Sequence, residues 1–499
     1  MNQRAKSTLS THEIRAKSVS GGLVAFVARV ISLGIQLAST LILVRFLNPA
    51  EFGIVAMVMA VSAFATLFSD LGLSSAAIQR KNVSDAQQSN LFWINVLLGT
   101  SLTFIVFALA PLLSKFYGQT EVKPVAQVVS INFLINSLSA QHGAMLVRSM
   151  QFSKKYIAGI AGAAIGFCAT IVLAIYDFSY WSIVFGNIAG GIVSTILLMH
   201  FSPLKIQLPT RHIGVKNFLS FGVDVTGFNI ANYFSRNLDN VLIGRYEGAV
   251  SLGLYSRAYQ LLMFPIMCIR MPVETVAFPV MSKLEPNSFE FRRYYCSVVR
   301  IVALTSMPLV CWLILTADEL VNILLGENWR EVSTIFSALA IAGVIQPAAS
   351  LRGLLMLSSG QSRRYFKSGL LTAVCTSLAF TIGIRWGVMG LVWAYVVVEW
   401  VLAYAMNIYA SKNTSVKKVD FFRETYDCVL AMLAVLGFCV LIGEMGYTPS
   451  SPMRSIIVNG LMTSSCSLVF VLLVPKNRIL FVSIISTLMS GDWRQASST

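Results

Sequence analysis

The stretch SGGLVAFVARVISLGIQLASTLILVR (residues 20–45) opens a series of long apolar runs that decide the fold. A helix of about 20 apolar residues crosses the hydrocarbon core of a bilayer. Working outward from this run, similar stretches separated by short polar breaks continue along the chain. They predict an all-α polytopic membrane protein with about 14 transmembrane helices. The expected spans are 20–45, 52–73, 90–113, 124–146, 156–176, 181–200, 218–243, 251–281, 295–316, 333–358, 366–385, 388–410, 425–445 and 455–475.

The composition agrees with a membrane protein. The 499 residues are 56% hydrophobic and only 12% charged, about half the charge of a soluble domain. This excludes a soluble enzyme and a disordered chain. The cysteines form no CxxC pair and the four histidines have no zinc-type spacing, so no metal site and no cofactor are expected.

The distribution of basic residues predicts the orientation. The N-terminal segment and the loops on its side of the membrane hold 25 of the 38 Lys and Arg, and the opposite side holds 7. Cytoplasmic loops carry such an excess. We therefore expect both termini to be cytoplasmic and attribute the net charge of +16 to these loops rather than to nucleic-acid binding.

An internal repeat with a period near 200 divides the chain. LVRFLNPAEFGIV around Leu43 aligns without gaps on IGRYEGAVSLGLY around Ile243, and later matches follow at offsets of 208 and 209. Six spans in each half give both halves the same orientation, which is typical of secondary transporters. The aligned pairs are Arg45 with Arg245, Gly53 with Gly253, Gly118 with Gly326 and Ser153 with Ser362.

The repeat predicts two pseudo-symmetric six-helix lobes and two further C-terminal helices. The expected segments are a cytoplasmic start (1–19), an N-lobe (20–200), a cytoplasmic linker (201–217), a C-lobe (218–410), a linker with helices 13 and 14 (411–476) and a cytoplasmic tail (477–499).

Matching polar stripes in the first and seventh spans mark a candidate site. Polar groups in hydrocarbon cost several kcal/mol each, so these stripes must face protein or water. A hydrogen-bonded seam and a water-filled cavity both satisfy this requirement, and the number of charges favours the cavity. The candidate residues are Arg29, Ser32 and Gln36 in the first span, and Asn229, Asn232, Arg236 and Asp239 in the seventh.

Further charges within the spans are functional candidates by default. Arg270 and Glu274, four residues apart on one helix, alternatively neutralise each other, and Arg300 near a span end could extend its head group to the interface. Asp70 is a candidate local cap or gate. The substrate-binding candidates are Arg257, Arg270 and Arg352, and the gating or ion-coupling candidates are Asp70, Asp239, Glu274 and Glu399.

Several strings resemble the polysaccharide transporter family, which contains the Wzx-type bacterial flippases, within the multidrug/oligosaccharidyl-lipid/polysaccharide exporter superfamily. The similarity runs over essentially the whole chain, and LFWIN with the preceding QRK resembles the exopolysaccharide branch. The strings are LVRFLNPAEFG, FSDLGLSSAAIQRK, LFWIN, NLDNVLIGRYEG, SLGLYSRAYQL, FPVMSKL and LLGENW.

The resemblance implies a flippase that moves a polyprenyl-pyrophosphate-linked oligosaccharide across the bacterial inner membrane by alternating access, in exopolysaccharide or lipopolysaccharide synthesis. It implies cavity arginines, for which Arg29, Arg257, Arg270 and Arg352 are the nearest matches, and a role for Asp239. It also implies partners: the lipid-linked substrate, the bilayer, and a polymerase with export machinery. The coupling ion stays open.

Two other functions are weighed against this one. A cation-coupled drug exporter of the same superfamily favours acidic and aromatic cavity residues over arginines. A membrane-embedded polysaccharide polymerase usually has a large external loop or paired catalytic carboxylates, and this sequence has neither. The residues therefore favour a transporter over an enzyme.

Overall fold

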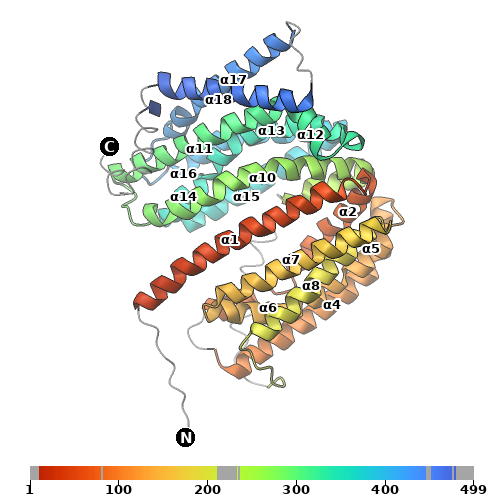
Figure 1. Ribbon diagram of the computed structural model, residues 1–499. Coiled ribbons are helices and arrows are strands. Elements are labelled where there is room, and N and C mark those ends of the chain that lie inside the picture. The colour runs from red at the N-terminus through yellow and green to blue at the C-terminus, as the bar shows by residue number, and fades with distance from the viewer. Residues whose placement is uncertain are drawn as a thin grey trace. The chain divides into compact units, whose positions relative to one another are not determined.

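The structure is a computed structural model that describes residues 11–79, 83–210, 233, 236–444, 451–474 and 477–478. Every regular element within these residues is a helix (Figure 1). Ten segments of this part of the chain are long and apolar enough to cross a membrane, and two of them, Glu331–Ser358 and Ser362–Ala410, each contain two α-helices. The predicted all-α polytopic membrane protein is confirmed.

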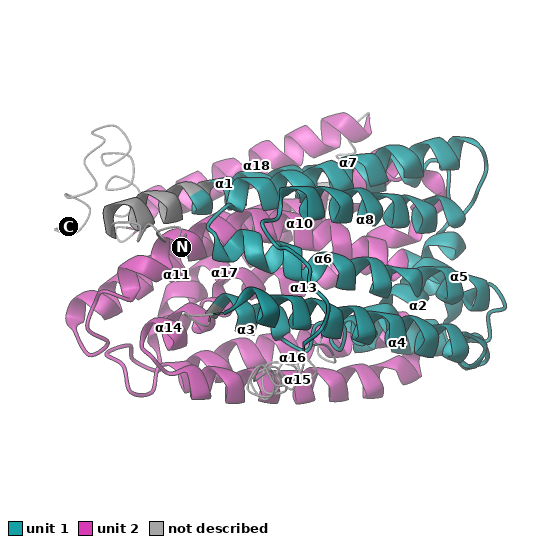
Figure 2. Ribbon diagram, turned by 90° about the horizontal axis from the view of Figure 1, so that it is seen from below, with its two compact units in different colours: residues 1–253 teal, residues 254–499 magenta. Residues whose placement is uncertain are grey.

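The chain divides into two compact units, residues 1–253 and 254–499 (Figure 2). The first unit contains α1 (Thr11–Leu43), α2 (Pro49–Thr66), α3 (Leu73–Gln79), α4 (Asp85–Tyr117), α5 (Val122–Val129), α6 (Ile131–Arg148), α7 (Phe152–Ile175) and α8 (Trp181–Phe201). Helix α10 (Gly248–Met281) begins in the first unit and continues in the second. The second unit continues with α11 (Phe289–Leu315), α12 (Ala317–Leu324), η1 (Glu327–Trp329), α13 (Glu331–Ser350), α14 (Arg352–Ser358), α15 (Ser362–Gly383), η2 (Ile384–Trp386), α16 (Gly387–Ala410), α17 (Asp420–Glu444) and α18 (Pro452–Leu473).

Several expected spans are divided into shorter helices. The second ends at Thr66, and a turn with positive φ at Leu71 and Gly72 leads into the separate helix α3. The fourth comprises α5 and α6, and the tenth comprises α13 and α14. The seventh span begins in residues outside the described part of the chain, so the lobe limits 20–200 and 218–410 remain predictions.

Local sequence explains where the helices begin and end. Asn48 caps α2 in a reciprocal box with Glu51: the Glu51 amide donates to Asn48 Oδ1 at 3.1 Å, and the Asn48 amide donates to Glu51 Oε2 at 2.7 Å. Ser84 and Gln87 form the same box at α4. These boxes satisfy amides that the first helical turn leaves without partners. Gly118 ends α4 with a φ of 68°, the left-handed conformation that glycine adopts without strain.

Equivalent positions of the sequence repeat have equivalent local structure. Arg45 and Arg245 are both exposed, and each follows two buried residues. Gly326 has a positive φ like Gly118. The turn before α7 and the turn before α15 also correspond: the Gln151 amide donates to Leu146 O, and the Gln361 amide donates to Met356 O, both at 2.8 Å. Gln151 and Gln361 are 210 residues apart, whereas the sequence match of Ser153 with Ser362 has an offset of 209.

The aligned glycines Gly53 and Gly253 lie at a reciprocal helix contact inside the first unit. A Cβ atom on Gly53 would lie 1.8 Å from Ala249 O, and one on Gly253 would lie 1.9 Å from Pro49 O. Ala249 is itself 200 residues after Pro49. Gly53 contacts Ala249, and the repeat-equivalent residue Gly253 contacts Pro49, the repeat equivalent of Ala249. The contact is therefore locally two-fold symmetric. The first turns of α2 and α10 therefore cross backbone to backbone, which only glycine permits.

Hydrogen bonds and an ion pair link the two C-terminal helices, α17 and α18, to α11 and α12. Arg292 on α11 makes a two-pronged pair with Asp420 on α17, with distances of 2.6 and 2.7 Å. Towards the other end of α11, the Trp312 indole donates to Ile456 O on α18 at 3.0 Å. Ser455 on α18 also donates to Glu319 on α12. The second unit thus holds this helix pair by polar contacts near both ends of α11.

Arg300 on α11 is buried, with 1% of its surface exposed. Its Nη1 donates to Glu424 O at 3.0 Å, its Nη2 to Asp427 at 2.8 Å and its Nε to Asn477 at 2.7 Å. The alternative that Arg300 extends to the membrane interface is therefore wrong, because its charge is satisfied by α17 and Asn477 inside the unit.

We expect Arg300→Met to lower the thermal unfolding midpoint of the purified protein by several degrees. The methionine fills similar space but leaves three acceptors without a donor, at about 1–3 kcal/mol for each that stays buried. Asp427 is partly exposed and contributes least. Arg293→Met is the matched control, because Arg293 lies on the same helix and is exposed. Equal midpoints for the two variants would contradict a clamping role.

Candidate functional site

The polar stripe of the first span lies on α1. Arg29 and Gln36 are exposed, whereas Ser32 is half-buried. Arg29 makes no ion pair with any residue that the structure describes. Thr40, at the end of the stripe, is buried and donates to Gln36 O at 3.0 Å. The stripe therefore presents a cationic group and an amide on the surface of the first unit.

The seventh-span stripe is described only in part. Asn229 and Asn232 lie outside the described residues. Arg236 is exposed and Asp239 is buried, and Asp239 Oδ1 accepts a hydrogen bond from the Asn240 amide at 2.8 Å. The predicted match between the two stripes remains a prediction.

Arg270 and Glu274 on α10 form an ion pair of 2.7 Å. The sequence allowed either a neutralising pair or two separate charges at these positions, and the structure confirms the pair. Both side chains are still about one-third exposed or more, at 42% and 34%. A pair this accessible can exchange its carboxylate partner for another anion, because exposed ion pairs are worth only about 0–1 kcal/mol.

Two further candidates lie close to this pair in the second unit. Arg352 on α14 is near enough to Glu399 on α16 and to Arg270 for their charges to interact, although Arg352 and Glu399 make no ion pair within 4.0 Å. Arg352 Nη1 instead approaches Ala349 O at 3.4 Å. Helices α10, α14 and α16 thus bring together two arginines and two glutamates, which we call the Arg–Glu centre: Arg270, Glu274, Arg352 and Glu399.

Polar residues that the sequence did not single out surround Arg352. The Tyr295 hydroxyl on α11 interacts electrostatically with Arg352 and donates to Asn407 Oδ1 on α16 at 3.1 Å. Tyr365 on α15 also interacts with Arg352. Arg257, which the sequence did single out, is half-buried on α10. A tyrosine or asparagine inside an apolar run is a weak signal, and only the helix packing shows that these residues converge.

Asp70 lies in the turn before α3. Its carboxylate accepts hydrogen bonds from the Ser74 amide and from the Ser74 hydroxyl at 2.7 Å, which confirms the local cap. It also accepts from Asn95 Nδ2 on α4 at 3.0 Å. Asn95 was missed, since a single asparagine within an apolar run has no spacing signal of its own.

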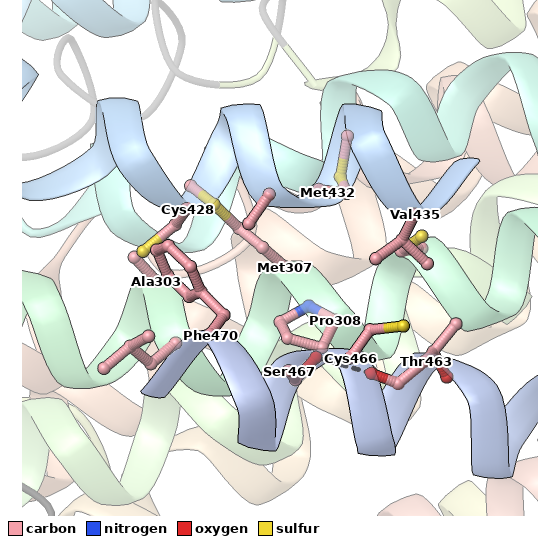
Figure 3. A pocket seen from close by; sticks show the side chains of 13 residues that line it. Ala303, Met307, Pro308, Cys428, Met432, Val435, Thr463, Cys466, Ser467 and Phe470 are labelled. Carbon is pink, nitrogen blue, oxygen red and sulfur yellow. Dashed lines mark hydrogen bonds between the residues drawn. The ribbon is translucent and has the colours of Figure 1, made fainter. Parts of the chain in front are cut away.

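An apolar pocket lies between α11, α17 and α18 (Figure 3). Its cavity volume is about 50 Å³. Its two hydroxyls bond within their own helix, Thr463 to Asn459 O and Ser467 to Thr463 O, at 2.9 and 2.6 Å. The pocket therefore suits a short apolar segment and not a sugar. Its lining includes Met307, Pro308, Cys311, Met432, Cys466 and Phe470.

The arrangement defines a class of protein: a polytopic helical membrane protein with an internal repeat and charged groups inside its spans. Arginine binds phosphate oxygens two at a time and keeps its charge. The four paired or clustered charges of the second unit can therefore hold an anion or move a cation, and neither task needs a reacting group. This class is that of secondary transporters.

The chain belongs to the family described as "Polysaccharide biosynthesis protein", whose model matches residues 42–334. It is 25% identical over 373 residues to the lipopolysaccharide biosynthesis protein WzxC of Escherichia coli, covering 74% of this chain and 76% of that one. It is also 25% identical over 413 residues to the teichuronic acid biosynthesis protein TuaB of Bacillus subtilis, covering 79% and 82%. The fold is similar to that of the lipid II flippase MurJ in an inward closed conformation, with a TM-score of 0.74 and 12% identity over 91% of this chain and 98% of that one. The predicted family resemblance is confirmed.

Proposed function

We propose that the chain is a flippase that moves a polyprenyl-pyrophosphate-linked oligosaccharide from the cytoplasmic to the outer leaflet of the bacterial inner membrane. The observation that carries this proposal is the Arg–Glu centre within the spans of a protein from a polysaccharide biosynthesis family. A sugar repeat unit carries many hydroxyls, which hydrocarbon cannot satisfy. Polar and charged groups inside the spans supply the partners that the lipid lacks.

Each part of the substrate has a matching group in the chain. Arg270 and Arg352 suit the pyrophosphate. Glu274, which pairs with Arg270, and Glu399, whose charge interacts with that of Arg352, couple its binding to an ion. Arg29 and Gln36 on α1 supply a cation and an amide for the polar part. The small apolar pocket between α11, α17 and α18 suits a short segment of the polyprenyl chain. The chain acts as a transporter without catalytic chemistry, works beside a polymerase and export machinery, and keeps both termini in the cytoplasm.

Alternating access requires a contact that opens and closes, and the Gly53–Gly253 crossing is well suited to this task. It joins equivalent turns of the two repeats, and it lies at the helix ends that follow Arg45 and Arg245, on the side that the basic loops predict to be external. Two backbones in contact hold by many small dispersion contacts rather than by ion pairs. Such a contact separates without leaving charges unpaired.

Deleting the gene should abolish surface polysaccharide and leave the lipid-linked repeat unit accessible only from the cytoplasmic leaflet. The measurement is polymer export in the host together with flipping of the extracted lipid-linked oligosaccharide by the purified protein in proteoliposomes. A chain with Arg270 and Arg352 both changed to glutamine should reach the membrane but restore neither readout. Efflux of cationic drugs with no effect on the glycan lipid would instead support a drug exporter. Polymer formation without flipping would support a polymerase.

A further inference from the structure

The first unit contains buried amide groups without partners, which the proposed function does not use. Gln141 on α6 has no exposed surface, and neither its Oε1 nor its Nε2 has a hydrogen-bond partner among the described residues. Asn95 on α4 is likewise fully buried, and its Oδ1 has no partner. Each such atom costs about 1–3 kcal/mol if it stays unsatisfied. Two of these three atoms, Asn95 Oδ1 and Gln141 Oε1, are oxygens that a cation can satisfy, whereas Gln141 Nε2 is a donor and needs an acceptor.

The packing of α4 against α6 places these amides opposite each other. The two helices run antiparallel within the first unit (Figure 2), with Thr103 donating to Ser130 O at 3.0 Å and Gly99 lying against Ser137. Asn95 is one turn from Gly99, and Gln141 is one turn from Ser137 in the matching direction. A turn further on, Phe92 packs with Met145. The register therefore directs Asn95 towards Gln141.

The Asp70 carboxylate completes this cluster. It lies 3.0 Å from Asn95 Nδ2, so the Asn95 side chain bridges Asp70 and the region of Gln141. No Lys or Arg lies within 4.0 Å of Asp70 in the described part of the chain. Apolar side chains flank α4 on either side of Asn95: Leu91 packs with Leu73 and Ala77, and Phe92 with Met145 and Leu204.

We propose that Asp70, Asn95 and Gln141 form a binding site for a monovalent cation, for which Na⁺ is the probe. Hard cations prefer carboxylate and amide oxygens. The cluster offers two amide oxygens that accept no hydrogen bond, Asn95 Oδ1 and Gln141 Oε1. It also offers the Asp70 carboxylate, which accepts bonds from Ser74 and Asn95. A single negative charge matches a monovalent rather than a divalent ion. The inference concerns cation binding alone and stands whether or not the proposed glycan substrate is right.

Binding of ²²Na⁺ to the purified full chain in detergent tests the site. We expect saturable binding to the unaltered protein, and we expect NaCl to raise its unfolding midpoint above that in choline chloride of equal ionic strength. Gln141→Met should weaken Na⁺ binding by about tenfold or more. In choline its midpoint should equal or exceed that of the unaltered chain, because two unsatisfied atoms are removed and the volume is kept. Loss of binding by a well-folded protein supports the site.

Gln346→Met is the matched control. Gln346 lies in the second unit and also has a buried Oε1 without a partner among the described residues. It should bind Na⁺ as the unaltered chain does. Asp70→Asn, which keeps an acceptor but removes the charge, should lose binding like Gln141→Met. No saturable binding to the unaltered protein, or full binding by Gln141→Met, would overturn the proposal and leave the cluster as a site for ordered water.

Discussion

Replacing Gly53 by alanine is expected to destabilise the protein strongly and to abolish export. The added Cβ would lie 1.8 Å from Ala249 O, well inside the distance that any real Cβ keeps from a backbone atom. Neither group sits on a flexible side chain, so the first turns of α2 and α10 must move apart. Overpacking of this kind typically costs about 1–3 kcal/mol. Gly253→Ala should have a similar effect, because its Cβ would meet Pro49 O at 1.9 Å.

The reciprocal contact makes a sharper prediction for the double variant. Both alanines separate the same two helix turns, so the combined loss of stability should be clearly smaller than the sum of the two single losses. The measurement is the unfolding midpoint in detergent, with export by the same variants in cells. Gly159→Ala is the control, because a Cβ there meets nothing within 4 Å and alanine favours the helix. Additive losses would show that the glycines act at separate contacts.

The sequence repeat predicted this contact only in part. An ungapped match at an offset of 200 placed Gly53 with Gly253 as equivalent positions, because both follow the same pattern of apolar, basic and aromatic residues. Equivalence does not imply contact. That equivalent turns touch each other depends on how α2 crosses α10, which no local pattern records. The all-α class and the rough positions of the apolar helices were predictable because hydropathy depends on residues close together in the chain.

Among the charged residues, pairs close together in the sequence were predictable and pairs far apart were not. Arg270 and Glu274 are four residues apart, so their pairing was foreseen as one of two possibilities. The burial of Arg300 could not be predicted from the sequence, because its hydrogen-bond partners lie more than 120 residues away on α17 and at Asn477. An arginine near the end of an apolar run has the same local signal whether it reaches water or clamps a helix.

Neutral polar residues were the least predictable part of the site. Asn95 is a single amide in an apolar run, whereas Gln141 and Tyr295 lie among other polar residues. No sequence pattern distinguishes a buried side chain of these types from one that faces water. Their burial, the missing partners of the two amides and the bond of Tyr295 to Asn407 appear only when α4 and α6, or α11 and α16, are packed together. Among the substrate-binding candidates, Arg270 and Arg352 converge within the second unit, whereas Arg29 belongs to the first unit.

Replacing Arg29 by glutamate should abolish polysaccharide export. Arg29 is exposed on α1 and makes no ion pair within the described residues, so its charge is available to a phosphate group. Two like charges at about 4 Å cost about 4 kcal/mol at an effective dielectric constant near 20, which corresponds to roughly a thousandfold weaker binding. Arg29→Lys should keep part of the export, because the positive charge remains while the planar two-donor fork is lost.

The control for this prediction is the same pair of changes at Arg45. Arg45 is also exposed, but it lies in the turn after α1 rather than on the polar stripe, so both changes there should reduce export much less. All variants must be present in the membrane at equal levels, as measured on a C-terminal tag, since a misfolded protein would also fail to export. Normal export by a well-expressed Arg29→Glu would show that this arginine contacts lipid head groups or protein instead of the glycan lipid. The polar stripe of α1 would then be a packing surface, and the Arg–Glu centre of the second unit would have to bind the pyrophosphate alone.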